Sequence, residues 1–498
     1  MAEASPSFFL SDGTDLTALF NYLTSENSRL RAEAESCEPV AEEGQEEFVL
    51  AHVDLLPEEF VELVKALLIP HILSKELELQ SETPHVTYPF DDLEATECVD
   101  YSESGEVDAA SLTKLVEIVT SNASSELTSV LLATFPLYTT ADSLLSLILA
   151  RLQVPVPKLM TASEHAYFVQ HRLKGIHTMI TAVIKQWIKM WPDSFRVGTH
   201  LFTQLGEFFP ANREFSVEAN TRILAKQLSK VQEEQLSSAV FTEERLPPPP
   251  ILPKELDFKS NPLLFWSTEE LSRQATLVDL NALKKIQIPE CLGRRWDQEK
   301  GLNAPNITRF SQRYGSRRAL FISSIVKEAD LDTRIRLVSK LLELAACCLD
   351  QFHNFETPWI IKGVFMSEVV HDLLPITMRE VLKKHANRAV YARIMGLYDI
   401  QTFEAVKVEM ERACTMPCWL ALRQDLYKID LSWQDFTQNG LINMYKHAKT
   451  AKIVLKLREY QSKDLCFHKI ALCYHFLKAK NFAIDDKECE RRAKALER

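Results

Sequence analysis

Glycine is scarce in this sequence, with only 12 among 498 residues, which disfavours turn-rich β architectures and glycine-rich phosphate-binding loops. No apolar run is long enough to span a bilayer, and the N-terminal residues lack the basic stretch and apolar core of a signal peptide. The chain also ends without a prenylation box. We therefore expect a cytoplasmic protein without a transmembrane segment, recruited to membranes only through its partners.

A surplus of positive charge is missing as well. The net charge is −12 and the pI calculated from the sequence is about 5.7. Proteins that bind a nucleic-acid backbone usually carry an excess of lysine and arginine. Nucleic acid is therefore not expected as a partner.

Patterns of metal ligands and of disulfide frameworks are absent. The 10 cysteines are scattered, and no CxxC pair is matched by a second CxxC or by HxxxH. His353 and His371 have no partners at metal-ligand spacing. We expect free thiols in a reducing compartment, no metal site and no cofactor.

Signatures of covalent catalysis are also lacking, since the chain contains no GxSxG elbow and no cysteine-protease pattern. What it does contain is helical periodicity, with 46% hydrophobic and 25% charged residues. The stretches 329–352 and 440–461 are its clearest amphipathic helices. The predicted fold class is all-α, and we expect no enzyme that makes or breaks covalent bonds.

Changes in composition along the chain predict two helical modules with a segment before, between and after them. These five parts are an acidic and partly helical segment at 1–100, a helical module at 101–240, a proline-rich linker at 241–253, a second helical module at 254–485, and a charged tail at 486–498 that is expected to fray. In the first module, apolar spacing predicts a helix over 107–121. Thr139 or Thr140 is the expected N-cap of a later helix, and Trp187 and Trp191 are expected in the core.

Four consecutive prolines at 247–250 predict an extended polyproline II rod. Such a rod works as a semi-rigid spacer between the two modules. The alternative is that Leu246–Pro250 docks into the aromatic-lined groove of a proline-binding domain. The spacer is favoured.

Three stretches of the first module resemble a known family. VDAASLTKLVEIVTS (107–121), LLATFPLYTTADSLLSLILARL (131–152) and RLKGIHTMITAVIKQWIKMWPDSF (172–195) occur in the order and spacing of the Ras exchanger motif. That motif precedes the catalytic domain of Ras guanine-nucleotide exchange factors. The resemblance covers residues 106–210.

The second module resembles the catalytic exchange domain of the same family, of the Son-of-Sevenless type, over residues 252–480. Its landmarks are RQATLVDLNALKKIQIPECLGRRW (273–296), APNITRFSQRYG (304–315), DQFHNF (350–355), MPCWLALRQDLYKIDL (416–431) and NGLINMYKHAKTAKIV (439–454). The resemblance implies two helical modules, with a helical hairpin protruding from the catalytic one. It also implies a guanine-nucleotide exchange factor for a small GTPase of the Ras, Rap or Ral type.

The resemblance also implies where the hairpin and its working residues lie. Counting without gaps from Phe355 places the hairpin near 363–385. The wedge residue then falls at Leu373, the usual carboxylate position at Thr377, and Glu380 follows one turn later. Pro375 departs from the family pattern and should kink or end the helix.

Further residues follow from the resemblance. Lys284, Arg309, Arg313 and Ser316 would contact the GTPase, with the basic residues facing its acidic switch region. Structural support is expected from Thr276, Phe355 and Asn306, the last as a helix N-cap. The alternative function is a catalytically silent exchange-domain fold that acts as a signalling adaptor or scaffold, because Pro375 and the missing carboxylate alter the expected hairpin.

Overall fold

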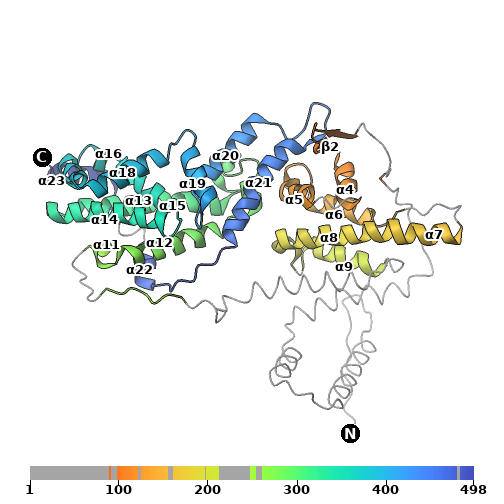
Figure 1. Cartoon of the computed structure of the whole chain (residues 1–498), viewed down its shortest axis with the longest axis horizontal. Coiled ribbons are helices and arrows are strands. Elements are labelled where there is room, and N and C mark those ends of the chain that lie inside the picture. Colours follow the sequence, from red (N-terminus) through yellow and green to blue (C-terminus); the bar gives the residue numbers. More distant parts are fainter. Residues whose placement is uncertain are drawn as a thin grey trace, which may run out of the picture. The chain divides into compact units, whose positions relative to one another are not determined.

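The computed structural model describes residues 89–90, 98–121, 125–154, 161–196, 198–211, 247–253, 261–478 and 483–497 (Figure 1). The helices expected before residue 89 and the expected end of the first module near 240 lie outside these residues. The all-α class is confirmed, and one small sheet accompanies the helices. Of the described helices, none is both long and apolar enough to cross a membrane.

The N-terminal module consists of two short strands and six α-helices among its described residues. They are β1 Val99–Tyr101, β2 Val107–Ala110, α4 Leu112–Ser121, α5 Ser125–Thr134, α6 Ala141–Ala150, α7 Ala162–Phe168, α8 Lys174–Met190 and α9 His200–Ala211. Trp187 on α8 is fully buried, with Phe135 and Phe195 at 5.2 and 5.5 Å from its ring centroid. The prediction that Trp187 and Trp191 belong to the core is confirmed.

Residues 107–121 do not form one helix, so that prediction is wrong for its first residues. Val107–Ala110 is the strand β2, and α4 begins at Leu112. The Oγ of Ser111 accepts a hydrogen bond from the Lys114 amide (3.2 Å), which fixes the start of the helix. The predicted cap at Thr140 is confirmed, because its side chain accepts from the amide of Ser143 and α6 follows.

The C-terminal module is made of helices packed on one another, with a two-residue strand. Its α-helices and strand are α11 Pro262–Phe265, α12 Thr268–Leu283, α13 Pro305–Val326, α14 Leu331–Asp350, α15 Glu356–Phe365, α16 Glu368–His371, α17 Pro375–Lys383, α18 His385–Leu397, α19 Glu404–Arg412, α20 Trp419–Ser432, β3 Ile442–Asn443, α21 Met444–Gln461, α22 Ala471–Phe476 and α23 Asp486–Leu496. The buried side chains of both modules belong to one contiguous hydrophobic cluster. The strand order β1-β2-β3 joins the modules through a shared sheet.

The charged tail does not fray, contrary to the prediction. Residues 486–496 form α23, which packs against α13 with Cys489 and Ala493 buried. The Glu497 carboxylate then accepts hydrogen bonds from the amides of Ile376 (2.6 Å) and Thr377 (2.9 Å). The tail therefore caps the first turn of α17.

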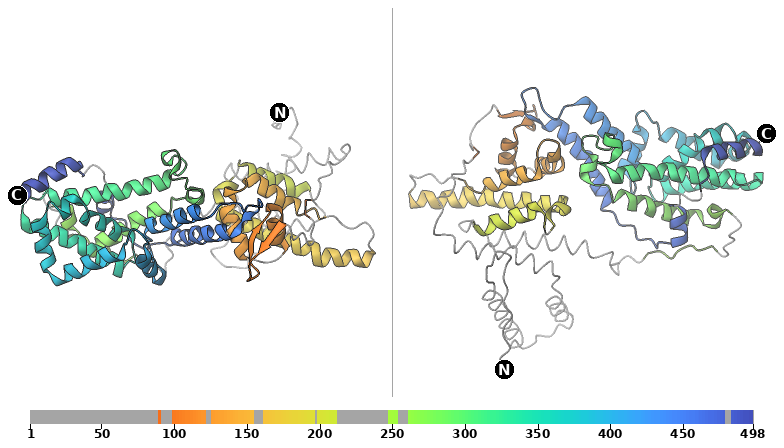
Figure 2. Two further views of the ribbon diagram at one scale, coloured as in Figure 1. Left: turned by 90° about the horizontal axis from the view of Figure 1, so that it is seen from above. Right: turned by 180° about the vertical axis from the view of Figure 1, so that it is seen from behind.

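Residues 363–385 do not form a hairpin, so the predicted hairpin location is wrong. The end of α15, the four-residue α16 and α17 follow one another, and Pro375 occupies the first turn of α17. The helical hairpin is formed instead by α20 and α21, which pack side by side and are joined by residues 433–443 (Figures 1 and 2). Ungapped counting from Phe355 failed because the intervening helices α15 to α19 pack into the body.

Candidate protein-interaction surface

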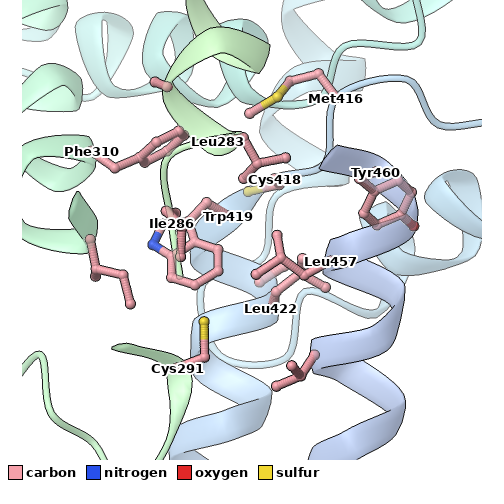
Figure 3. Close-up of a cluster of buried hydrophobic side chains, with 14 of the residues drawn as sticks. Leu283, Ile286, Cys291, Phe310, Met416, Cys418, Trp419, Leu422, Leu457 and Tyr460 are labelled. Carbon is pink, nitrogen blue, oxygen red and sulfur yellow. The ribbon is translucent and has the colours of Figure 1, made fainter. Parts of the chain in front are cut away.

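The base of the α20–α21 hairpin is anchored in the apolar core of the C-terminal module. Figure 3 shows Trp419 and Leu422 of α20 and Leu457 of α21 beside Ile286 and Cys291 from the segment after α12. All five side chains are at most 8% exposed. This burial fixes the base of the hairpin, because moving either helix would expose apolar surface.

Polar contacts hold the end of the hairpin to the same anchor. The side-chain amide of Gln461, the last residue of α21, donates to the carbonyl oxygens of Leu283 (2.7 Å) and Ile286 (2.8 Å). These carbonyls belong to the C-terminal end of α12, where the Leu283 oxygen also accepts from the Ile286 amide, and to the turn that follows. The amide therefore satisfies buried acceptors and ties α21 to α12.

Two carboxylates at the other end of the hairpin share one lysine. Lys446 Nζ lies 3.0 Å from Asp430 Oδ1 on α20 and 2.7 Å from Asp435 Oδ1 in the connecting segment. The Lys446 side chain is 4% exposed and that of Asp430 is 8% exposed. This ion-pair triad fixes the tip, and removing one partner would leave a buried charge without compensation.

The N-terminal module braces the hairpin at this tip. Strand β2 pairs antiparallel with β3, with Ala109 opposite Asn443 and Ala110 opposite Ile442. Helix α5 packs against α21 along the same side. Further toward the base, the guanidinium of Arg458 donates to the Met190 carbonyl oxygen at the end of α8 (2.8 Å). The hairpin is therefore held from two modules at once.

His447 lies at the centre of this contact and is fully buried. Its Nε2 is 3.3 Å from the Asp435 carbonyl oxygen, and its ring packs against that of Tyr138. Burial lowers the pKa of His447 to about 4, against the raising effect of Asp435. The imidazole is therefore neutral near pH 7, which suits an apolar contact between modules.

The hairpin also carries apolar side chains that are exposed to solvent. Tyr427 and Leu431 on α20, Phe436 in the connection and Tyr445 on α21 are 39–56% exposed. Lys449 Nζ lies over the Tyr445 ring, 4.6 Å from its centroid, and near Trp433. We call Tyr427, Leu431, Trp433, Phe436 and Tyr445 the hairpin aromatic surface. Exposed apolar groups of this kind mark surfaces that bind other proteins.

The three residues predicted as the hairpin wedge lie elsewhere. Leu373 is partly buried against the core beside α16. Thr377 is fully buried, with its hydroxyl bonded to the Glu497 carboxylate. Glu380 pairs with Lys383, and this hydrogen-bonded contact holds the pKa of the carboxyl below its usual range. The structure does not bring these residues to the α20–α21 hairpin.

Three of the four predicted GTPase-contact residues come together. Arg309, Arg313 and Ser316 on α13 line a pocket of about 260 Å³ between α12, α13 and α22. Lys284 lies outside this pocket, at the end of α12, where its ammonium pairs with Asp464 (2.5 Å). Helical spacing explains the grouping, since residues 309, 313 and 316 share one face of α13.

The predicted supporting residues are buried, but one has a different role. Thr276 is fully buried and its hydroxyl accepts from the Asn354 side-chain amide (3.0 Å), while Phe355 is 3% exposed. Asn306 is not an N-cap, because α13 begins at Pro305. Instead, the Glu290 carboxylate accepts hydrogen bonds from the backbone amide of Asn306 (3.0 Å) and from the Asn306 side-chain amide (2.6 Å). Glu290 therefore caps the helix from another segment.

Sequence reasoning missed the hairpin aromatic surface, although a signal for it was present. The landmarks 416–431 and 439–454 predict two helices separated by the short stretch SWQDFTQ (432–438). Two neighbouring helices with so short a connection generally pack antiparallel. This spacing alone predicts a hairpin at the position where the structure has one.

Fold and surface together define a two-module helical protein whose C-terminal module presents a braced helical hairpin. The RasGEF N-terminal motif family matches residues 106–208, and the RasGEF domain family matches residues 270–448. Both matches fall on the two modules described above. The chain belongs to the Ras guanine-nucleotide exchange factor family, as a divergent member.

Curated relatives show how far the chain has diverged. Ras guanine nucleotide exchange factor I of Dictyostelium discoideum is 25% identical over 366 residues, covering 72% of this chain and 43% of that protein. Ras guanine nucleotide exchange factor A of the same organism is 25% identical over 400 residues, which cover 76% of this chain and 62% of that protein. Human Ras-specific guanine nucleotide-releasing factor 1 is 24% identical over 233 residues, which cover 46% of this chain and 18% of that protein. The chain therefore spans less than two thirds of each of these relatives.

Proposed function

We propose that this protein is a guanine-nucleotide exchange factor, which promotes GDP release from a small GTPase of the Ras, Rap or Ral type. The observation that supports this proposal most is the α20–α21 hairpin, anchored at its base and braced at its tip, in a chain of this family. Three relatives carry exchange or nucleotide release from Ras proteins in their names.

Such a function requires binding energy and no covalent chemistry. An exchange factor lowers nucleotide affinity by binding the nucleotide-free GTPase more tightly than the loaded form, since the two equilibria are linked. A hairpin held by buried contacts loses little conformational entropy on binding. The fixed geometry of Lys446, Asp430 and Asp435 at the tip fits this requirement.

We place the GTPase-contacting residues on the hairpin aromatic surface. Tyr427 and Leu431 lie one turn apart on α20 and form an exposed apolar stripe. The roles proposed for Leu373, Thr377 and Glu380 therefore pass to this stripe. Arg309, Arg313 and Ser316 remain proposed secondary contacts for an acidic switch segment, and so does Lys284.

The direct test is release of a fluorescent guanine nucleotide from Ras, Rap and Ral proteins, with and without the full chain. We expect faster release from at least one of them, and at least 10-fold less acceleration with Leu431→Asp, because a charge is introduced into an apolar contact. Met366→Asp is the matched control, since Met366 is 60% exposed and lies outside the hairpin. No acceleration by the unaltered chain at micromolar concentration would contradict the proposal.

An adaptor without exchange activity is the second candidate, favoured by the low identity of the chain to the exchange factors it matches, 24–25%. The two functions differ in how complex formation depends on nucleotide. An exchange factor forms a stable complex with the nucleotide-free GTPase, and GTP disrupts that complex. A complex that is indifferent to nucleotide, measured by size-exclusion chromatography, would favour the adaptor.

For the proline segment we propose the spacer role. Residues 247–253 lie against the first turns of α12, where the Pro249 carbonyl oxygen accepts from Arg273 (3.2 Å) and the Ile251 amide donates to Glu270 (2.9 Å). These contacts fix the segment on the body, as a spacer requires. Pro249 and Pro250 are exposed, as docking into a proline-binding groove would require. Calorimetric titration of the chain with SH3 and WW domains tests this alternative.

A further inference from the structure

The pocket between α12, α13 and α22 is lined by an unusual set of side chains. It has a volume of about 260 Å³, and its lining residues are Val278, Arg309, Gln312, Arg313, Ser316, Arg317, Leu477 and Lys478. Four of these carry positive charge, two more are polar, and none is acidic. We call this site the arginine pocket. Its charge contrasts with the net charge of −12 of the whole chain.

One guanidinium in the arginine pocket is buried and incompletely satisfied. Arg317 is 3% exposed and its Nη1 pairs with Asp279 Oδ1 at 2.6 Å. The same Nη1 lies 3.3 Å from the Thr357 hydroxyl. Within the described part of the chain, Arg317 Nε has no hydrogen-bond partner. A buried donor without an acceptor is costly, so a ligand that supplies one is stabilised.

A second guanidinium, that of Arg313, faces an unfavourable environment. Its Nη1 donates to the Val278 carbonyl oxygen at 3.2 Å. Burial lowers the pKa of Arg313, the nearby charge of Arg317 lowers it further, and Asp279 and Tyr474 act in the opposite direction. Positive charge is thus concentrated here, while Asp279 is already paired with Arg317. An anion in the pocket would relieve this repulsion.

We propose that the arginine pocket binds a phosphoryl group, carried by a small phosphorylated solute or by a phosphoinositide headgroup. Guanidinium groups bind phosphate through parallel N–H donors, and several lie around one cavity here. The Gln312 side-chain amide lines the same cavity and can add a neutral hydrogen bond, whereas the Ser316 hydroxyl already donates to the Gln312 carbonyl oxygen (2.9 Å). This proposal does not depend on exchange activity, but a phosphoryl group in the pocket would exclude the acidic switch segment for which Arg309, Arg313 and Ser316 are proposed above.

The number of charges favours phosphate over the single carboxylate of a protein partner. Arg309, Arg313, Arg317 and Lys478 carry four positive charges, of which Asp279 compensates one. A carboxylate offers one charge and two oxygens, whereas a phosphate monoester offers nearly two charges and three strong acceptor oxygens. The phosphoryl group therefore matches the donors and the charge more completely.

The test is calorimetric titration of the full chain with inorganic phosphate at constant ionic strength, with chloride as the reference anion. We expect saturable binding, weakened about 10-fold or more by Arg313→Gln, since a charge-assisted hydrogen bond is lost. Lys478→Gln should also weaken binding, and this exposed rim residue can be changed without disturbing the core. Arg412→Gln, an equal change of charge on exposed α19, should leave binding unchanged.

A second arm distinguishes the sources of the phosphoryl group. Sedimentation with phosphatidylcholine vesicles, with and without a phosphoinositide, supports the lipid source if the protein pellets only with the phosphoinositide. Binding of inorganic phosphate without pelleting supports a soluble ligand. No saturable phosphate binding, or equal weakening by Arg412→Gln, overturns the proposal. A third outcome also overturns it: the unaltered chain does not bind phosphate, and Arg313→Gln slows nucleotide release from the GTPase. The pocket would then bind an acidic side chain of the GTPase.

Discussion

The phenol ring of Tyr138 packs on the imidazole of His447, with ring centroids 4.8 Å apart. Tyr138 follows α5 in the N-terminal module, and His447 lies in the first turn of α21. The Tyr138 hydroxyl lies 3.4 Å from Thr134 and from the Leu131 carbonyl oxygen, both in its own module. The contact between modules at this point is therefore between rings, and neither ring contributes a charge to it near pH 7.

This ring contact should control how firmly the hairpin is braced. We expect Tyr138→Ala to destabilise the protein by about 3 kcal/mol and to lower hydrogen-exchange protection of α21 and β3. Nucleotide release by the proposed exchange activity should slow with it. Tyr138→Phe is the matched control, because it keeps the ring and loses only long hydrogen bonds. Equal damage from both variants would contradict a brace made of ring packing.

Acid should weaken the same contact, because the pKa of His447 is about 4 in the folded protein and about 6.5 when unfolded. The unfolded chain therefore binds the proton first, so stability is full above about pH 6.5 and is lost as the pH falls toward 4. The loss at this residue is about 3 kcal/mol, with Asp435 and Lys446 facing the ring. Urea unfolding at pH 7.5 and pH 5 covers about 2 kcal/mol of this loss, and the carboxyl group of Glu356 acts in the opposite direction over the same range.

A His447→Gln variant isolates this effect, since glutamine fills much of the same space and does not titrate in that range. On going from pH 7.5 to pH 5, the variant should gain about 2 kcal/mol of stability relative to the unaltered chain, a comparison in which the opposite effect of Glu356 cancels. Parallel pH profiles for the two proteins would show that another group is responsible.

The ion-pair triad at the tip offers another test. Lys446→Met removes the cation between Asp430 and Asp435 while keeping an unbranched side chain, and should cost about 3–5 kcal/mol. Neutralising both carboxylates in the same variant, with Asp430→Asn and Asp435→Asn, should restore much of the loss. Denaturant unfolding of the single and triple variants makes the comparison. The idea fails if the triple variant is as unstable as the single one.

Gly363 on α15 lies against a ring of α13, where a Cβ would overlap the Tyr314 hydroxyl. Gly363→Ala should therefore destabilise the protein by about 1–3 kcal/mol, and by less in a Tyr314→Phe background. Gly396→Ala is the matched control, because nothing lies within 4 Å of its Cβ position. That change in α18 should stabilise the protein by about 0.5–1 kcal/mol. Thermal unfolding of all four variants tests the pattern.

Glu356 should make the protein less stable as the pH rises. Burial raises its pKa to about 8 and the nearby Asp279 adds to this, although the Trp419 amide donates to the carboxylate. The folded state then holds a proton that the unfolded chain releases above about pH 4.5, so stability falls between pH 4.5 and 8. Glu356→Gln keeps an acceptor for Trp419 and should be more stable at pH 8, with little difference at pH 4.5.

A surface change controls for the loss of one negative charge. Glu459→Gln alters an exposed carboxylate on α21, whose ion pair with Lys456 contributes little. Its melting temperature should follow that of the unaltered chain across the same pH range. If Glu356→Gln follows it too, the Glu356 carboxyl is not held protonated.

Local signals in the sequence predict much of the helical fold. The apolar spacing over 329–352 predicts α14, and the hydroxyl of Thr140 marks the start of α6, because both depend on neighbouring residues alone. The same holds for Trp187, which lies on the apolar face of α8. These elements are fixed by contacts within a few turns of the chain.

The errors concern residues whose partners are distant in the sequence. Val107–Ala110 is a strand because it pairs with β1 just before it and, at Ala109 and Ala110, with β3 more than 300 residues later. The first turn of α13 is capped by Glu290, which belongs to another segment, so Asn306 could not be assigned correctly from its neighbours. The site was misplaced for a related reason, since ungapped counting from Phe355 ignores the packing of α15 to α19 into the body, which leaves no local pattern.

The pairing of β2 with β3 limits where the chain can be divided into fragments that fold. The stretch between the two family matches, 209–269, looks like a natural cleavage point, but the folded unit continues across it through Ala109 and Asn443. A fragment beginning near 247 would leave β3 with unpaired backbone N–H and C=O groups at an open edge. Such an edge invites pairing between copies, so the fragment should self-associate more readily than the whole chain.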